Sequence, residues 1–113
     1  MSLRVKSDKL LTLLGFASKA GRLSFGAAKS EEALKSGKSS LIVSACDISA
    51  KSRKEMEFSA KKYSVGFIVL KESDITAVSR AVGRQCGILS VNDSGFADAL
   101  LKAYDEGGNA NDK

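Results

Sequence analysis

A chain of 113 residues with 43% hydrophobic residues, 27% charged residues and a net charge of +5 has the size and composition of one globular domain. It contains no histidine, which excludes nucleophile activation by histidine and excludes histidine-ligated metal sites. Its two cysteines, Cys46 and Cys86, are too few and too far apart for a disulfide framework or a zinc site.

The spacing of apolar and turn-forming residues predicts five helices that alternate with four strands. Helices are expected over residues 8–20, 27–36, 50–63, 75–82 and 94–101, and strands over residues 22–25, 41–46, 65–70 and 87–91. The residues predicted to cap helix N-termini are Ser7, Ser49, Ser73 or Asp74, and Asp93 or Ser94. Glycines at positions 21, 37 and 83 are predicted to end the helices that precede them.

This alternation, with short links between the elements, favours an α/β fold with helices on both faces of one sheet. We expect a single domain over residues 1–103, followed by a flexible tail over residues 104–113. No apolar run approaches the ~20 residues of a membrane span, and residues 1–10 lack the apolar stretch of a signal peptide. We therefore expect a cytoplasmic protein without a membrane partner. Both cysteines adjoin apolar strand-like runs, which predicts buried, reduced thiols.

The positive charge is concentrated in the first part of the chain. Residues 1–62 hold thirteen Lys and Arg against six Asp and Glu, whereas residues 63–103 hold four of each. Clustered cations favour a polyanionic partner, because they release condensed counterions when they meet phosphates. The alternative explanation is an ordinary solvated surface.

The predicted strand–turn–helix around Gly26 is the first candidate site. A glycine that opens a helix lets another backbone come close, and the unpaired N–H groups of the first helical turn attract phosphates and base edges. Lys19, Arg22 and Lys29 lie nearby in the sequence. The alternative is an ordinary α/β junction. A nucleotide-binding phosphate loop is excluded, because no Lys-Ser or Lys-Thr follows Gly26.

Two other segments are candidates. The loop from Gly83 to Gly87 places two glycines around a polar turn that can reach outward, or it is a plain helix–strand connection. Lys51, Arg53 and Lys54 fall in the first turns of a predicted helix, where the helix dipole disfavours cations. Cations in that position indicate either an anionic partner or a solvated helix end.

Four segments together resemble a family of ribosomal proteins. The segments are residues 15–23 (GFASKAGRL), 45–49 (ACDIS), 80–87 (RAVGRQCG) and 93–97 (DSGFA). With Gly26 and Gly37 at an interval of eleven, they are similar to the bacterial YlxQ-like branch of the superfamily of ribosomal proteins L-seven-Ae, L-thirty-e and S-twelve-e and the Gadd proteins. The resemblance implies a three-layer α-β-α sandwich with a mixed four-stranded sheet. It also implies the binding of kink-turn RNA.

The motif that reads kink-turn RNA in this family, Gly-x-Asn-Glu-x-x-Lys, is altered in this chain. Its three polar positions are occupied by Ala28, Lys29 and Glu32. An alanine makes none of the base-edge hydrogen bonds of an asparagine, so selectivity for kink-turns is left open while backbone and shape recognition remain. The surface implied by the resemblance consists of Lys19, Arg22, Gly26, Ala27, Ala28, Lys29, Glu32, Gly83, Arg84, Gln85, Cys86 and Gly87.

The sequence thus predicts a monomeric, non-catalytic protein that binds structured RNA, either ribosomal RNA or a kink-turn RNA, and that needs no cofactor or metal. A protein-interaction module of the same fold is the alternative, which the replaced readers favour. An enzyme is the third hypothesis, and it requires a deep pocket with strongly perturbed Lys or Asp groups.

Overall fold

The structure is a computed structural model in which residues 2–106 are described. The elements are α1 (Ser2–Lys19), β1 (Leu23–Phe25), α2 (Gly26–Ser36), β2 (Leu41–Ala45), α3 (Ala50–Lys62), β3 (Gly66–Leu70), α4 (Ile75–Val82), β4 (Ile88–Val91) and α5 (Ser94–Tyr104). Helices and strands alternate in the predicted order, and each predicted element is present.

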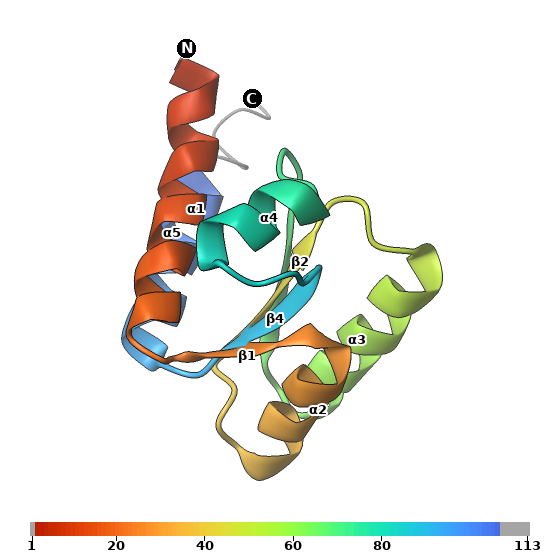
Figure 1. The fold of residues 1–113 in the computed structure, drawn as a ribbon. Coiled ribbons are helices and arrows are strands. Elements are labelled where there is room, and N and C mark those ends of the chain that lie inside the picture. The colour runs from red at the N-terminus through yellow and green to blue at the C-terminus, as the bar shows by residue number, and fades with distance from the viewer. Residues whose placement is uncertain (1, 107–113) are drawn as a thin grey trace.

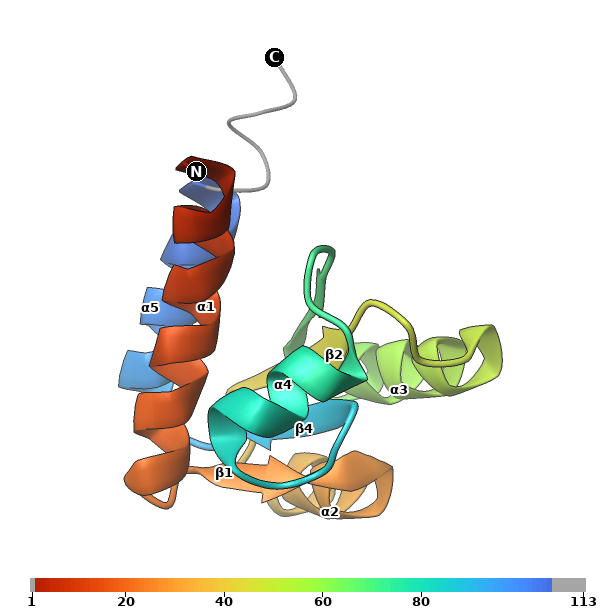
Figure 2. The ribbon, with the colours of Figure 1, turned by 45° about the horizontal axis from the view of Figure 1, so that its top comes forward.

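The four strands form one mixed sheet in the order β1-β4-β2-β3. Strands β2 and β3 are parallel, and β4 runs antiparallel to both β1 and β2. Helices α2 and α3 cover one face of this sheet, and α1, α4 and α5 cover the other (Figures 1 and 2). The predicted three-layer α-β-α sandwich with a mixed four-stranded sheet is therefore confirmed.

Alternating side chains of the central strand β2 build both halves of the core. Leu41 and Val43 point into the larger cluster, which they share with the helices α1, α4 and α5. Ile42 lies between them in the sequence and points into the smaller cluster, where it joins Met56 and Ala60 of α3. All three strand residues are at most 1% exposed, which explains why this strand reads as a continuous apolar run.

Side chains cap three of the five helices at their N-termini. Ser49, Asp74 and Asp93 each accept a hydrogen bond from the backbone N–H three residues further along, at 3.1, 2.8 and 2.8 Å. These are the N-caps of α3, α4 and α5, and they satisfy N–H groups that have no partner inside the helix. The structure thereby selects Asp74 over Ser73 and Asp93 over Ser94.

Two predictions about local structure are wrong. Helix α1 begins at Ser2 and not after Ser7, because residues 2–7 contain no glycine or proline that would stop a helix. Cys46 is exposed, because β2 ends at Ala45 and the chain turns there. Cys86 is buried, as predicted.

The predicted tail overlaps the last helix by one residue. Tyr104, the first residue of the predicted tail, is the last residue of α5, and residues 107–113 lie outside the described part of the chain. Between residues 2 and 106, no helix combines the length and the apolar character that a bilayer crossing requires.

The N-cap of α5 gives a first testable prediction. Asp93→Ala should lower the free energy of unfolding by about 1 kcal/mol, because it removes the acceptor of the Phe96 N–H. Urea denaturation followed by circular dichroism measures the change. Asp98→Ala, which replaces an exposed aspartate inside the same helix, is the control and should stay within about 0.5 kcal/mol of the parent chain. Equal losses in the two variants would show that the cap contributes nothing.

Candidate nucleic-acid interface

The sheet brings the start of α2 next to the loop that precedes β4. Strands β1 and β4 are antiparallel, and Phe25 at the end of β1 pairs with Leu89 near the start of β4. Gly26 directly follows Phe25, and the loop of residues 83–87 directly precedes Ile88. Two segments almost sixty residues apart in the sequence therefore meet where β1 ends and β4 begins.

Arg84 joins the two segments by a direct contact. Its guanidinium lies 5.1 Å from the centroid of the Phe25 ring, within the range of a cation–π interaction. The loop that carries it is held at its other end, since the Cys86 N–H donates to Ser79 Oγ at 3.0 Å and the Gly87 carbonyl accepts from β2 at 2.8 Å. The positive charge of Arg84 is thus held beside the start of α2.

The first turn of α2 is open to an incoming partner. The residue at its N-cap position is Phe25, which has no side-chain acceptor, whereas α3, α4 and α5 each have one. The turn contains no acidic residue, and the side chains of Ala27 and Ala28 are short and exposed. Its N–H groups and the positive end of the helix dipole therefore face outward, where they favour phosphate or carbonyl oxygens. We call Gly26–Lys29, together with Arg84 and Gln85, the cradle.

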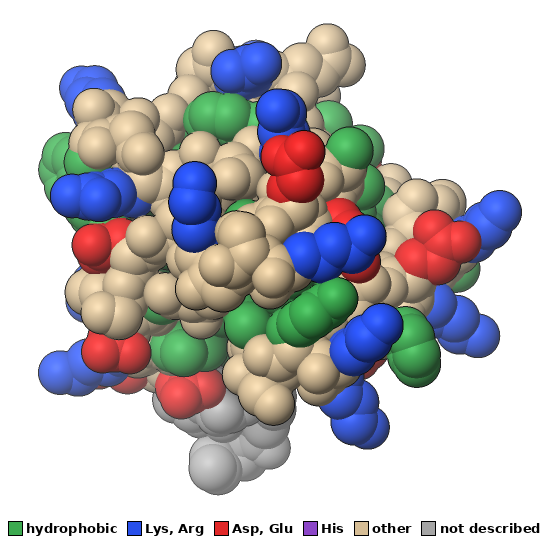
Figure 3. Space-filling model, turned by 90° about the horizontal axis from the view of Figure 1, so that it is seen from below, with side chains coloured by type: hydrophobic (Ala, Val, Ile, Leu, Met, Phe, Trp, Pro, Cys, Tyr) green, Lys and Arg blue, Asp and Glu red, His purple; other side chains and the backbone are tan. Residues whose placement is uncertain are grey.

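Positive side chains continue beyond the cradle. Seen from below, Lys and Arg side chains project around the rim of the molecule, with acidic and hydrophobic side chains between them (Figure 3). Lys29 forms an ion pair with Glu32 at 3.8 Å, and both side chains are largely exposed, at 69% and 74%. Such an exposed pair contributes little stability, so either group can turn to a partner at small cost.

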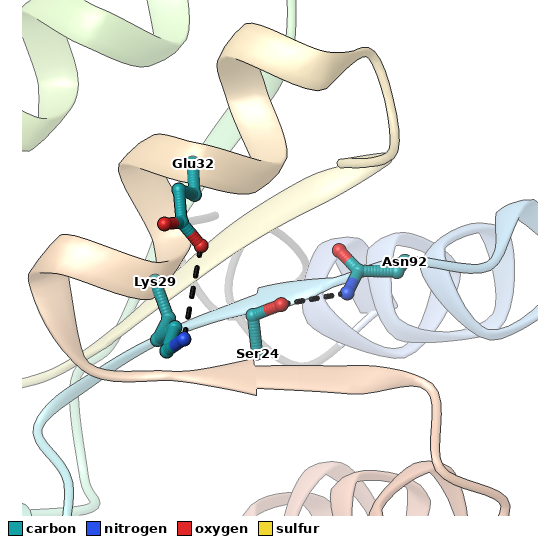
Figure 4. A network of polar contacts seen from close by, with 4 residues as sticks. All are labelled: Ser24, Lys29, Glu32 and Asn92. Carbon is teal, nitrogen blue, oxygen red and sulfur yellow. Dashed lines mark hydrogen bonds and ion pairs between the residues drawn. The ribbon is translucent and has the colours of Figure 1, made fainter.

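A polar strip extends the cradle along the edge strand β1. Lys29 and Glu32 lie on α2 above β1, which carries Ser24, and Asn92 lies beside Ser24 just after the end of β4 (Figure 4). Asn92 Nδ2 donates to Ser24 Oγ at 2.8 Å, and Asn92 Oδ1 accepts from Ser90 Oγ at 2.7 Å. These two bonds fix the orientation of the Asn92 amide. The strip therefore presents ordered polar groups beside the two opposite charges of α2.

The structure places the other predicted site residues apart from the cradle. Lys19 and Arg22 are exposed but precede β1: Arg22 lies at the opposite end of this three-residue strand, about 10 Å from the start of α2 along the strand, and Lys19 ends α1 before it. Gly83 ends α4 with a positive φ of 77°, which a glycine adopts without strain. These residues can contact a partner bound in the cradle only if that partner spans the length of β1 or wraps around the loop.

Cys86 and Gly87 face the core. The Cys86 side chain is only 7% exposed, and burial raises the pKa of its thiol above the ordinary value, while the charge of Arg84 offsets part of that rise. A Cβ atom at Gly87 would lie 2.9 Å from Ile48 Cγ2. The thiol of Cys86 fills the interior, as predicted for a buried cysteine, and the assignment of this residue to the RNA-binding surface stays a prediction. Arg84 and Gln85 are the exposed side chains of this loop.

Three features of the site were not predicted from the sequence. These are the contact of Phe25 with Arg84, the polar strip through Ser24 and Asn92, and a groove of about 350 Å³ between α2 and α3. The groove is lined by Ala27, Ala28, Glu31, Ser52, Glu55, Met56 and Ser59. For the first feature the sequence holds one indication, the aromatic residue Phe25 directly before Gly26. The strip and the groove arise from tertiary packing and have no signature in the local sequence.

Comparison with known proteins relates this fold to an RNA-binding protein. A protein of unknown function from Bacillus halodurans is similar over 86% of this chain and 97% of its own, with a TM-score of 0.81 and 26% identity. The 15.5kD RNA-binding protein of Giardia lamblia is similar over 94% of this chain and 88% of its own, with a TM-score of 0.72 and 14% identity. No protein-family profile and no curated protein matches the sequence. The second likeness shows a shared fold.

Proposed function

We propose that this chain binds structured RNA without catalysing a reaction, and that the cradle is where the RNA docks. The observation that carries the proposal is the uncapped first turn of α2 with the Arg84 guanidinium held beside it. The fold supports it, because the Giardia lamblia protein with the same architecture is an RNA-binding protein.

The cradle offers two kinds of contact to an RNA backbone. The N–H groups of the first turn of α2 have no side-chain cap and suit phosphate oxygens, while Lys29 and Arg84 supply positive charge nearby. Lys19 and Arg22, at the far end of β1, meet an RNA only if it runs along that edge strand. The groups of the cradle are hydrogen-bond donors and cations, which suit the phosphates of an RNA.

The finer proposal is that the protein belongs to the superfamily of L-seven-Ae, L-thirty-e, S-twelve-e and Gadd proteins, in its YlxQ-like branch, and binds a bent RNA as a cytoplasmic monomer. The segments quoted from the sequence and the shared fold support it. Because Ala28 lacks a polar side chain, recognition rests on the backbone and the shape of the RNA more than on base edges. A ribosomal RNA with a kink is the partner this chemistry suits best.

Titration tests the proposal directly. A fluorescently labelled kink-turn RNA, a straight RNA duplex and a fragment of ribosomal RNA are titrated with the protein at 50 and 200 mM salt, with anisotropy as the readout. We expect measurable affinity for the bent RNA and a loss of affinity with salt, since each phosphate contact contributes a slope of about −0.7 to −0.9 in log K against log salt. Equal weak binding to kink-turn and duplex would refute selectivity for bent RNA. Absence of binding to all three would refute RNA binding itself.

A further inference from the structure

The outer face of α3 carries an exposed aromatic ring. Phe58 has 71% of its surface exposed, more than the other exposed large hydrophobic residue of the described chain, Phe16 at 55%. A single exposed hydrophobic side chain is common on protein surfaces. The neighbours of Phe58 on the helix are what distinguish it.

Four lysines share the face of α3 on which Phe58 lies. Helical spacing puts residues three, four and seven positions apart on one face. The residues at these distances from Phe58 with a positive charge are Lys51, Lys54, Lys61 and Lys62, and all four are exposed. One acid, Glu55, occupies the remaining position three residues before Phe58. The Lys62 ammonium is 5.6 Å from the centroid of the Tyr63 ring, within the range of a cation–π interaction.

The start of α3 is an unfavourable place for its positive charges. Its first turn contains no acidic residue, and Lys51, Arg53 and Lys54 follow the Ser49 cap within five positions. The positive end of the helix dipole repels cations there, so these residues do not stabilise the helix. A partner that supplies negative charge explains their presence better than the stability of the fold does.

This face lies beside the cradle. Strands β1 and β2 both run antiparallel to β4, so they point in the same direction. The helices that follow them, α2 and α3, therefore begin at the same end of the strands. The two helices pack side by side on one face (Figures 1 and 2). The groove between them is lined by Ala27, Ala28 and Glu31 on the α2 side and by Ser52, Glu55, Met56 and Ser59 on the α3 side, so an RNA crosses it past two carboxylates before it meets the lysines of α3. An RNA held in the cradle can therefore continue over α3 without leaving this side of the molecule.

We propose that the outer face of α3 is a second RNA contact, which binds an unpaired segment flanking the folded RNA that the cradle holds. A base stacks on the Phe58 ring, and the adjoining phosphates contact Lys54 and Lys61 on either side of it. Proteins that hold single strands combine an aromatic ring for the base with cations for the backbone, and α3 presents that combination. An acidic peptide would use the lysines but gives no role to the ring between them. This inference rests on the proposed function.

Two RNAs and two phenylalanine variants test the second contact. One RNA is the blunt kink-turn, and the other carries a single-stranded extension of uridines with one 2-aminopurine. We expect the extension to strengthen binding to the parent protein at least fivefold and to quench the 2-aminopurine fluorescence by stacking. Phe58→Ala should remove both effects and leave the affinity for the blunt RNA unchanged. Phe16→Ala, which removes a similarly exposed ring from α1 in the opposite layer, should change neither.

A charge variant separates the phosphate contact from the stacking. Lys61→Glu should weaken binding of the extended RNA several-fold more than it weakens binding of the blunt RNA. Lys102→Glu, the same change on α5, should affect both RNAs little.

The second contact would be overturned by an extension that adds no affinity, or by one whose added affinity Phe58→Ala leaves intact. In both cases, binding of the blunt RNA would still support the cradle. If neither RNA bound the parent protein, the proposed function would fail together with this inference. The second contact would also be overturned if a polyglutamate peptide bound the protein in a Phe58-dependent way while the RNA extension added no Phe58-dependent affinity.

Discussion

Arg84→Glu should weaken the binding of structured RNA about 10- to 100-fold. The substitution removes a guanidinium beside the first turn of α2, and a charge-assisted hydrogen bond of this kind contributes about 1.5–3 kcal/mol. It also places a carboxylate near N–H groups that have no side-chain acceptor of their own, so the new side chain competes with the RNA for them. Anisotropy titrations at several salt concentrations measure the loss. The slope of log K against log salt should also become shallower by about 0.7–0.9, which is the contribution of one phosphate contact.

Two further variants control this result. Lys102→Glu changes the net charge by the same amount on α5, away from the cradle, and should weaken binding much less than Arg84→Glu. Arg84→Lys keeps the charge but loses the flat guanidinium that lies on the Phe25 ring, so it should fall between the parent protein and Arg84→Glu. If Arg84→Glu and Lys102→Glu weakened binding equally, the effect would come from net charge alone and the cradle would have no special role.

The triple variant Ala28→Asn, Lys29→Glu, Glu32→Lys should raise the preference for a kink-turn over a straight duplex about tenfold or more. The three substitutions restore the polar readers of the family motif at the start of α2. Each base-edge contact contributes about 1–3 kcal/mol of discrimination. The net charge stays the same, because the exposed ion pair between residues 29 and 32 is reversed and not removed. The ratio of the two Kd values at one salt concentration is the measurement.

The double variant Lys29→Glu, Glu32→Lys is the matched control for the triple variant. It reverses the ion pair but leaves Ala28 in place, so it should gain less selectivity than the triple variant. Because the charge is constant across the parent chain, the double and the triple variant, binding to the straight duplex should change little. An unchanged Kd ratio in the triple variant would show that the cradle does not meet the base edges of a kink.

Local chemistry made most of the fold predictable from the sequence. Ser49 marked the start of α3, and Gly37 and Gly83 marked the ends of α2 and α4, because capping depends on a few neighbouring residues. The apolar run over residues 41–46 predicted a strand, and β2 occupies residues 41–45 of it with every residue buried. The start of α1 was misplaced because a serine can cap a helix or lie inside one, and the local sequence does not distinguish these cases.

Contacts between distant segments were less predictable. The prediction that the start of α2 and the loop of residues 83–87 share one surface is confirmed as a matter of placement, but the stacking of Arg84 on Phe25 depends on how β1 pairs with β4. Asp47, just after β2, accepts a hydrogen bond from the N–H of Ile75, 28 residues away, and this partner has no signature in the local sequence. The burial of the Cys86 thiol, by contrast, followed from the apolar run that it adjoins. The RNA contacts assigned to the cradle remain predictions.

Amide chemical shifts of the ¹⁵N-labelled protein, recorded while a kink-turn RNA is added, test the central proposal most directly. Each backbone N–H reports its own surroundings, so the bound surface is located without any substitution. We predict that the largest changes fall on residues 26–29 and on residues 84 and 85. Changes confined to α1 and α5 on the opposite layer, with the first turn of α2 unaffected, would contradict the proposal that RNA docks in the cradle.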